Sequence, residues 1–173
     1  MKKFAIAFPA LLGILLLAGC SVPIPGLGGG NEPVPEINAE PAAVREYRQQ
    51  VQPILEDTAR DVAKVANVDV KVDGGNVSVS LDPNAAQQAE REARQGLEEL
   101  RNVDPPAGLE DTHQRLIRSY EDGVPALSNF IAAVQSGDAG RISQSVQEDL
   151  PKIRRLLSDV QGIQQQLRQA GGQ

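Results

Sequence analysis

The chain has 173 residues, and its composition limits the partners it can bind. It carries 17 basic and 23 acidic side chains, and a formal charge of −6 argues against binding the phosphate backbone of nucleic acids or docking on anionic lipid. Aromatic residues make up 3% of the chain, too few for a sugar-stacking platform or a row of base-stacking sites.

The first 19 residues combine a basic start with a short apolar segment. Lys2 and Lys3 precede an apolar run over residues 4–18, which is shorter than the roughly 20 residues that a helix needs to span a bilayer. This pattern predicts a signal peptide over residues 1–19 rather than a retained membrane helix. Its removal leaves 15 basic and 23 acidic side chains, a formal charge near −8.

The only cysteine, Cys20, directly follows this segment. It can form no intramolecular disulfide, and no second cysteine or nearby histidine stands at a zinc-site spacing. The sequence Leu17-Ala18-Gly19-Cys20 resembles the lipobox of bacterial lipoproteins. That resemblance implies a diacylglyceryl group on the sulfur of Cys20 and cleavage on its amino side. We therefore expect a lipid-anchored protein on the extracytoplasmic face of a bacterial membrane, since two or three acyl chains anchor stably.

Residues 20–40 comprise the cysteine and a segment rich in proline, glycine and acidic residues, without helical or strand periodicity. Such a segment buries too little apolar surface to offset the entropy lost on ordering, so it predicts a flexible tether. About 20 flexible residues have a typical end-to-end span on the order of 25 Å. A folded domain over residues 41–173 is then expected close above the membrane.

From Pro41 onward, apolar residues recur at intervals of three and four, as in amphipathic helices. Four stripes predict four helices, and short connections favour antiparallel neighbours, so the expected fold is mainly α, an antiparallel four-helix bundle. Asp82-Pro83 and Asp104-Pro105 are expected to begin the second and third helices. The stripes are Val44, Tyr47, Val51, Leu55, Thr58, Val62 and Val65; Ala86, Ala89, Ala93, Leu97, Leu100 and Val103; Leu109, His113, Leu116, Tyr120, Leu127, Ile131 and Val134; and Ile142, Val146, Leu150, Ile153, Leu157, Val160, Ile163 and Leu167.

Between the first two helices, residues 68–81 read VDVKVDGGNVSVSL and alternate with period two. This alternation predicts a β-hairpin inserted between helices 1 and 2, with a two-residue turn at Gly74-Gly75. The turn puts all six apolar residues on one face of the ribbon. An isolated hairpin is only marginally stable, so that face is expected to pack on the bundle or to meet a partner. The facing pairs are Val72 with Val77, Val70 with Val79, and Val68 with Leu81.

His113 is the single histidine of the chain, and it falls on the buried stripe of the third helix. We favour a structural role, a hydrogen bond to a backbone carbonyl or to a side chain on a neighbouring helix, because a buried imidazole must satisfy its nitrogens. Ligation of a metal or haem is the alternative, but bundle metal sites usually recruit several ligands from facing helices. The nearest acidic residues, Glu110 and Asp111, are expected on other faces. We therefore predict no metal site and no cofactor.

Other chemistry has little support in the sequence. It contains no HExxH or GxSxG motif, no phosphate-binding glycine loop and no EF-hand loop. Acidic pairs such as Glu98-Glu99 and Glu148-Asp149 lie on arginine-rich helices, where carboxylates usually form solvated faces with weak pairing. A paired-carboxylate envelope hydrolase is thus the least favoured of the possible functions.

The lipobox together with four helical stripes resembles the large group of bacterial lipoproteins with small α-helical ectodomains, many of them uncharacterised. Residues 103–138 are especially similar, with a two-proline start, a downstream histidine and a Gly-Asp break. This likeness covers about a fifth of the chain and brings no active residues with it. We expect a non-enzymatic protein that contacts the membrane through its lipid and binds another envelope protein. A bundle that binds a small molecule or a metal is the alternative.

Overall fold

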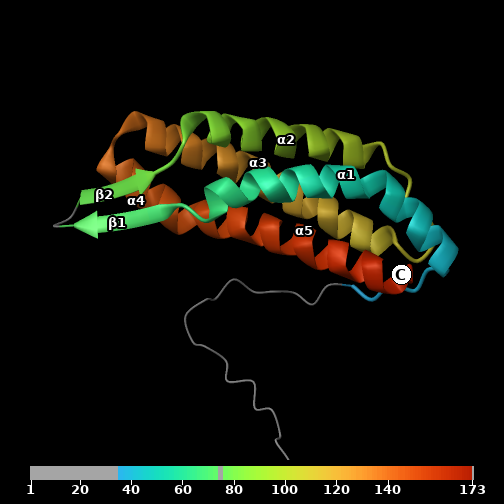
Figure 1. Ribbon diagram of the computed structural model, residues 1–173. Coiled ribbons are helices and arrows are strands. Elements are labelled where there is room, and N and C mark those ends of the chain that lie inside the picture. The colour runs from blue at the N-terminus through green and yellow to red at the C-terminus, as the bar shows by residue number, and fades with distance from the viewer. Residues whose placement is uncertain (1–34, 74–75, 173) are drawn as a thin grey trace, which may run out of the picture.

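The computed structural model describes residues 35–73 and 76–172 (Figure 1). Cys20, the lipobox residues before it and the proposed Gly74-Gly75 turn lie outside the described residues. The described chain is mainly α-helical, with one two-stranded antiparallel sheet. In chain order the elements are α1 (Pro41–Ala66), β1 (Asp69–Asp73), β2 (Asn76–Ser80), α2 (Pro83–Arg101), α3 (Glu110–Ser136), α4 (Ala139–Glu148) and α5 (Leu150–Ala170).

The start of α2 is as predicted, but that of α3 is not. The carboxylate of Asp82 accepts a hydrogen bond from the backbone N–H of Asn84, at 2.9 Å, and so caps α2. In contrast, Asp104 lies in a loop, and α3 begins only at Glu110. The physical reason is Gly108, whose φ of +86° is left-handed and cannot continue a right-handed helix.

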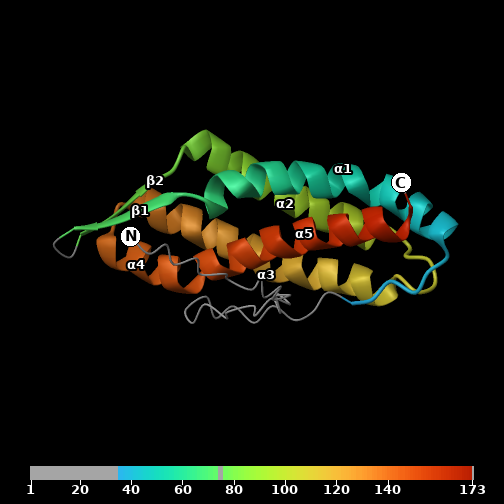
Figure 2. The ribbon, with the colours of Figure 1, turned by 60° about the horizontal axis from the view of Figure 1, so that its bottom comes forward.

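The long helices pack side by side in a closed ring (Figures 1 and 2). α1 contacts α2 and α5, and α3 contacts the same two helices on the other side. The predicted stripes form the core, and only Val103, Val134, Val146 and Leu157 among their members are merely half-buried. None of the helices in the described part of the chain is long and apolar enough to cross a membrane.

The fourth predicted helix is divided at Asp149, which ends α4 and precedes α5. Pro151 stands in the first turn of α5 and has no N–H to donate to the preceding turn. At the division itself, the carboxylate of Asp149 accepts a hydrogen bond from the Ser145 hydroxyl at 2.6 Å. Beyond this division the core position is Leu156, which is fully buried, whereas the predicted Leu157 is half-buried.

The hairpin has the predicted register, with Val70 opposite Val79 and Val72 opposite Val77. Strand β2 lies against α4, and Val68, Val70, Val79 and Leu81 are half-buried against the core. On the other face, Lys71 and Ser78 are exposed. This part of the apolar face is therefore covered by the helical body.

The sequence predicts a flexible tether up to residue 40, but part of residues 35–40 packs on the helices. Ile37 and Ala39 are half-buried against the core, and we call residues 36–39 the strap. The strap lies at the end of the body where the start of α1 meets the end of α5. At this end, Arg45 Nη1 donates a hydrogen bond to the carbonyl oxygen of Gly171 at 3.0 Å. The hairpin projects from the opposite end (Figure 1).

Candidate functional site

His113 forms a buried contact with α1. Its side chain is 3% exposed, and its Nδ1 atom lies 2.8 Å from the hydroxyl oxygen of Tyr47. Burial raises the pKa of Tyr47, so the phenol keeps its proton and can donate it to Nδ1. Burial also lowers the pKa of His113, while the charge of Asp104 acts in the opposite direction. This contact is the interhelical hydrogen bond that the structural interpretation of His113 expects.

The acidic neighbours of His113 lie on the surface. Glu110 and Asp111 are exposed, and the Glu110 carboxylate accepts a hydrogen bond from the backbone N–H of Gly108 at 2.7 Å. Within residues 35–73 and 76–172, no group of three or more His, Cys, Asp or Glu side chains is arranged to hold a metal ion.

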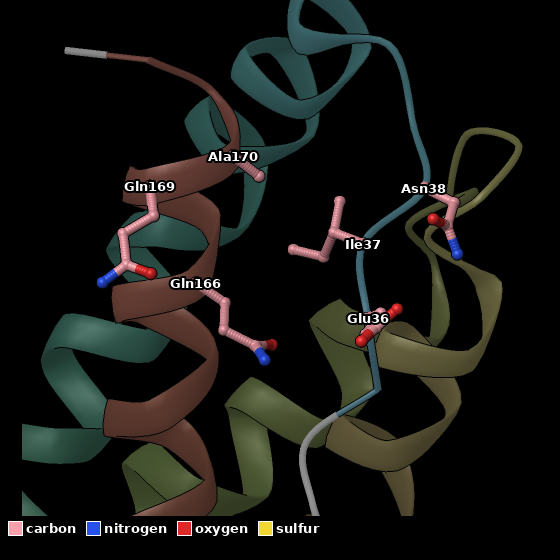
Figure 3. A pocket seen from close by; sticks show the side chains of 6 residues that line it. All are labelled: Glu36, Ile37, Asn38, Gln166, Gln169 and Ala170. Carbon is pink, nitrogen blue, oxygen red and sulfur yellow. The ribbon is translucent and has the colours of Figure 1, made fainter.

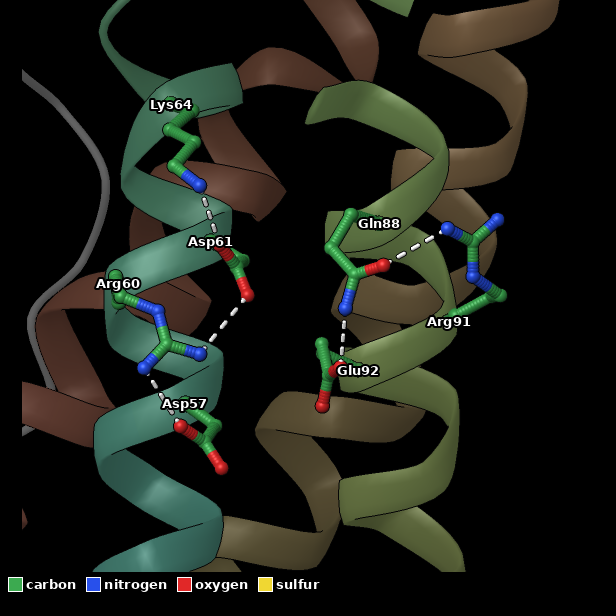
Figure 4. A network of polar contacts seen from close by, with 7 residues as sticks. All are labelled: Asp57, Arg60, Asp61, Lys64, Gln88, Arg91 and Glu92. Carbon is green, nitrogen blue, oxygen red and sulfur yellow. Dashed lines mark hydrogen bonds and ion pairs between the residues drawn. The ribbon is translucent and has the colours of Figure 1, made fainter. Parts of the chain in front are cut away.

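A second polar cluster lies on α1 (Figure 4). Asp61 is 2% exposed and accepts hydrogen bonds from Lys64 Nζ at 2.6 Å and from Arg60 Nη2 at 3.3 Å. Arg60 also forms an ion pair with Asp57 at 2.8 Å. Burial by itself would raise the pKa of Asp61, but the bonds from Lys64 and Arg60 outweigh it and hold that pKa below its usual value. Asp61 is therefore charged at neutral pH.

The facing surface of α2 carries two Gln–Glu pairs. Gln88 donates to the carboxylate of Glu92, and Gln95 donates to that of Glu99 at 2.7 Å. Between α1 and α2 lies a groove of about 260 Å³, which we call the α1–α2 groove. Its lining residues are Pro53, Ile54, Asp57, Glu92, Gln95, Gly96 and Glu99.

Sequence reasoning treated such carboxylates as solvated helix faces and did not find this groove. The structure separates the predicted Glu98-Glu99 pair, since Glu99 lines the groove and Glu98 does not. A signal was present: the two Gln–Glu pairs are seven residues apart, a spacing that places both on one face of a helix. The sequence held no information on which residues of α1 would face them.

A larger and more open hollow of about 410 Å³ lies between the strap and the last turns of α5 (Figure 3). Ile37 and Gln166 point into this space. The side-chain carbonyl oxygen of Gln166 is buried there and has no hydrogen-bond partner. The lining residues are Glu36, Ile37, Asn38, Gln166, Gln169 and Ala170.

A third polar cluster joins α3 to α5. The buried carboxylate of Asp159 accepts hydrogen bonds from Arg115 Nη2 at 2.8 Å and from the Ser119 hydroxyl at 2.5 Å. Ser119 and Asp159 each precede a predicted core residue, and no local pattern indicates that they meet. This cluster fixes the two helices against each other and opens into none of the hollows described above.

The predicted lipidation residue Cys20 and its lipobox neighbours Leu17, Ala18 and Gly19 lie outside the described residues. No protein-family model, no curated protein and no solved structure matches the chain. Functional proposals for this protein therefore depend on its own residues.

Proposed function

We propose that this protein is a lipid-anchored, non-enzymatic helical bundle of the bacterial cell envelope that binds another envelope protein. The observation that carries the proposal is the position of Cys20, directly after a basic start and a 15-residue apolar run. Residues with small side chains precede it, as in a lipobox. The resemblance to bacterial lipoproteins with small helical ectodomains supports the same function.

We further propose that the fold is an antiparallel four-helix bundle made of α1, α2, α3 and α5, with the hairpin inserted between its first two helices. The closed ring of contacts among these helices supports this classification. In it, α4 is a short extension of the fourth helix that covers the hairpin.

An anchor at Cys20 would place the hairpin away from the membrane. The described chain enters at the strap end, and α1 carries it along the body to the hairpin (Figure 2). The 26 residues of α1 span roughly 39 Å at 1.5 Å per residue. The long sides of the body and the hairpin end are then the surfaces that a partner can reach.

Replacement of Cys20 tests the anchor. In a bacterial host, Cys20→Ser is expected to lose incorporation of labelled palmitate and to leave the detergent phase on phase separation. Ser21→Ala is the matched control and is expected to behave like the wild type. A Cys20→Ser protein that still fractionates with the lipid-modified wild type would overturn the proposal.

Binding of a small molecule is a second candidate function, and one observation favours it. The unpartnered carbonyl oxygen of Gln166 faces the hollow beneath the strap and would accept a hydrogen bond from a ligand. Native mass spectrometry of the purified full chain tests this function. A stoichiometric bound molecule that is lost in Gln166→Leu would support it, and a ligand-free mass in the wild type would contradict it.

A further inference from the structure

The strap is an extended segment that borders the larger hollow, which we call the strap hollow (Figure 3). Burial along the strap alternates with period two. Ile37 and Ala39 are half-buried against the core. The residues beside them, Glu36, Asn38 and Glu40, are exposed. Successive side chains of a β-strand point to opposite faces in this way, so the strap has the pattern of a strand although it belongs to no sheet of the described chain.

One backbone edge of the strap is occupied, and the other faces the strap hollow. In Figure 3 the strap lies between the α2–α3 loop, which passes beside Asn38, and α5 on the far side of the hollow. On the loop side, a Cβ atom on Gly108 would lie 2.8 Å from the backbone carbon of Asn38. On the α5 side, within the described residues, no backbone hydrogen bond joins residues 36–39 to a helix. The edge toward α5 is therefore open to a second strand.

The wall of the strap hollow on α5 supplies a second, independent observation. The side-chain carbonyl oxygen of Gln166 is buried there without a hydrogen-bond partner in the described part of the chain. Buried polar groups normally have partners, and those without one need an explanation. Gln166 as a whole is only half-buried, so a small rotation of its side chain brings the oxygen to a donor in the hollow. A backbone N–H of an added strand is such a donor.

The shape of the strap hollow favours a peptide over a small molecule. Sites for small molecules are concave and enclose most of the ligand surface, whereas this hollow is bounded by the strap and α5 and is open on its outer side. A peptide strand needs only a backbone edge to pair with and a surface to lie on. A volume of about 410 Å³ suits a short extended run of residues rather than a helix, which is about 10–12 Å across. We propose that an extended segment of the partner protein pairs with the strap and fills this hollow.

This inference rests on the proposed function, because it names the kind of segment through which the partner binds. The strap runs beside the last turns of α5 rather than across the tip of the body (Figure 1), so the hollow opens on a long side that a partner can reach. Apolar side chains of the segment would lie against Ile37 and Ala170. Of the described residues that line the hollow, Glu36 alone carries a charge, which favours a lysine or arginine in the segment.

A peptide titration tests the pairing. The probe is fluorescein-labelled Lys-Val-Thr-Val-Thr with an amidated end, and its anisotropy is followed with the full chain in non-ionic detergent. We expect Gln166→Leu to raise Kd about fivefold, because a hydrogen bond between neutral groups contributes a factor of roughly 2 to 13 in affinity. Gln165→Leu is the matched control, since it makes the same change at an exposed neighbouring residue that does not line the hollow. Its Kd is expected to equal that of the wild type.

Two further measurements separate strand pairing from other modes of binding. Hydrogen exchange over residues 36–39 is expected to slow when the peptide is added, since pairing occupies backbone N–H groups of the strap. A peptide that is N-methylated at its valines and threonines keeps its side chains but loses these N–H donors, and it is expected not to bind. Equal Kd values for Gln165→Leu and Gln166→Leu, equal binding of the N-methylated peptide, or unchanged exchange at saturating peptide would each overturn the pairing.

The remaining outcomes separate this inference from the proposed function. If the peptide does not bind but the wild type still captures a partner protein from membranes, the pairing fails and the proposed function stands. Peptide binding by a chain that captures no protein would overturn the proposed function and leave the pairing. A small molecule that purifies with the wild type and blocks the peptide would overturn the pairing in favour of the second candidate function.

Discussion

Single buried polar contacts couple neighbouring helices in this protein. His113 and Tyr47 link α3 to α1 through a 2.8 Å hydrogen bond, and their rings meet edge to face with centroids 5.8 Å apart. Because both side chains are buried, water cannot replace either partner. Tyr120 differs from Tyr47, since its buried hydroxyl contacts the Thr58 side chain outside hydrogen-bond geometry. The two tyrosines therefore form a matched pair for experiment.

Removal of the Tyr47 hydroxyl is expected to destabilise the fold. Tyr47→Phe leaves Nδ1 of His113 buried without a partner, which costs about 1–3 kcal/mol of the free energy of unfolding. Tyr120→Phe removes a hydroxyl whose contact with the Thr58 side chain falls outside hydrogen-bond geometry, so a smaller loss than that of Tyr47→Phe is expected. Urea unfolding followed by circular dichroism measures both. A larger loss for Tyr120→Phe than for Tyr47→Phe would contradict this assignment.

The environment of His113 also predicts a pH dependence. Burial lowers its pKa below the 6.5 of the unfolded chain, so the unfolded state binds the proton more readily. The contribution of His113 to stability is therefore full above pH 6.5 and decreases as the pH falls below that value. His113→Gln is expected to unfold at a modestly lower temperature at neutral pH and to lose part of this acid sensitivity. Equal loss of stability on acidification in both proteins would argue against the assignment.

At the scale of elements, the hairpin and α4 depend on each other. A two-stranded ribbon is marginal alone, and β2 lies against α4, which is only 10 residues long. Ile142 of α4 is buried, and Val70 and Val79 of the hairpin pack against the core. Packing against the helical body thus gives the hairpin the support that an isolated two-stranded ribbon lacks.

The register of the hairpin predicts unequal effects on its two faces. Val79→Asp places a charge on the face that packs against the core and is expected to cost about 1–3 kcal/mol. Ser78→Asp introduces the same charge on the exposed face and is expected to stay within about 0.5 kcal/mol. Thermal unfolding of the two variants measures the difference. Equal shifts would mean that the apolar face is not covered.

At the scale of the whole molecule, the strap joins the helical body to the proposed anchor. It crosses the body beside the α2–α3 loop, where a Cβ atom on Gly108 would lie 2.8 Å from the backbone carbon of Asn38. Ile37 and Ala39 hold it against the core from the other side. The path of the chain into α1 therefore depends on this crossing.

Gly108→Ala is expected to loosen the strap. The new methyl group collides with the backbone of Asn38, and the left-handed φ of +86° is strained for alanine, so the free energy of unfolding should fall by about 1–3 kcal/mol. Hydrogen exchange over residues 36–39 should increase. Ala107→Ser, on the exposed neighbouring residue, is the control and should leave both unchanged. Unchanged exchange in Gly108→Ala would contradict the role given to this crossing.

The sequence by itself determined the features that depend on local periodicity. The stripe from Val44 to Val65 follows from the 3.6-residue helical repeat, and the pairing of Val70 with Val79 follows from period two and the position of the glycine pair. Both are properties of residues close together in the chain. Local reasoning misplaced the start of α3, because the left-handed conformation of Gly108 is set by a loop that also contacts the strap.

Only the tertiary structure decided which distant polar groups meet. Asp159 lies 40 residues from Ser119, and their contact exists only because α3 packs on α5. Asp57 and Glu92 likewise share a groove only because α1 lies beside α2. Hydrophobic burial fixes which face of each helix points inward, but it is non-directional. The rotation and axial position of each helix decide which side chains come together at its edges, and packing of the whole bundle sets both.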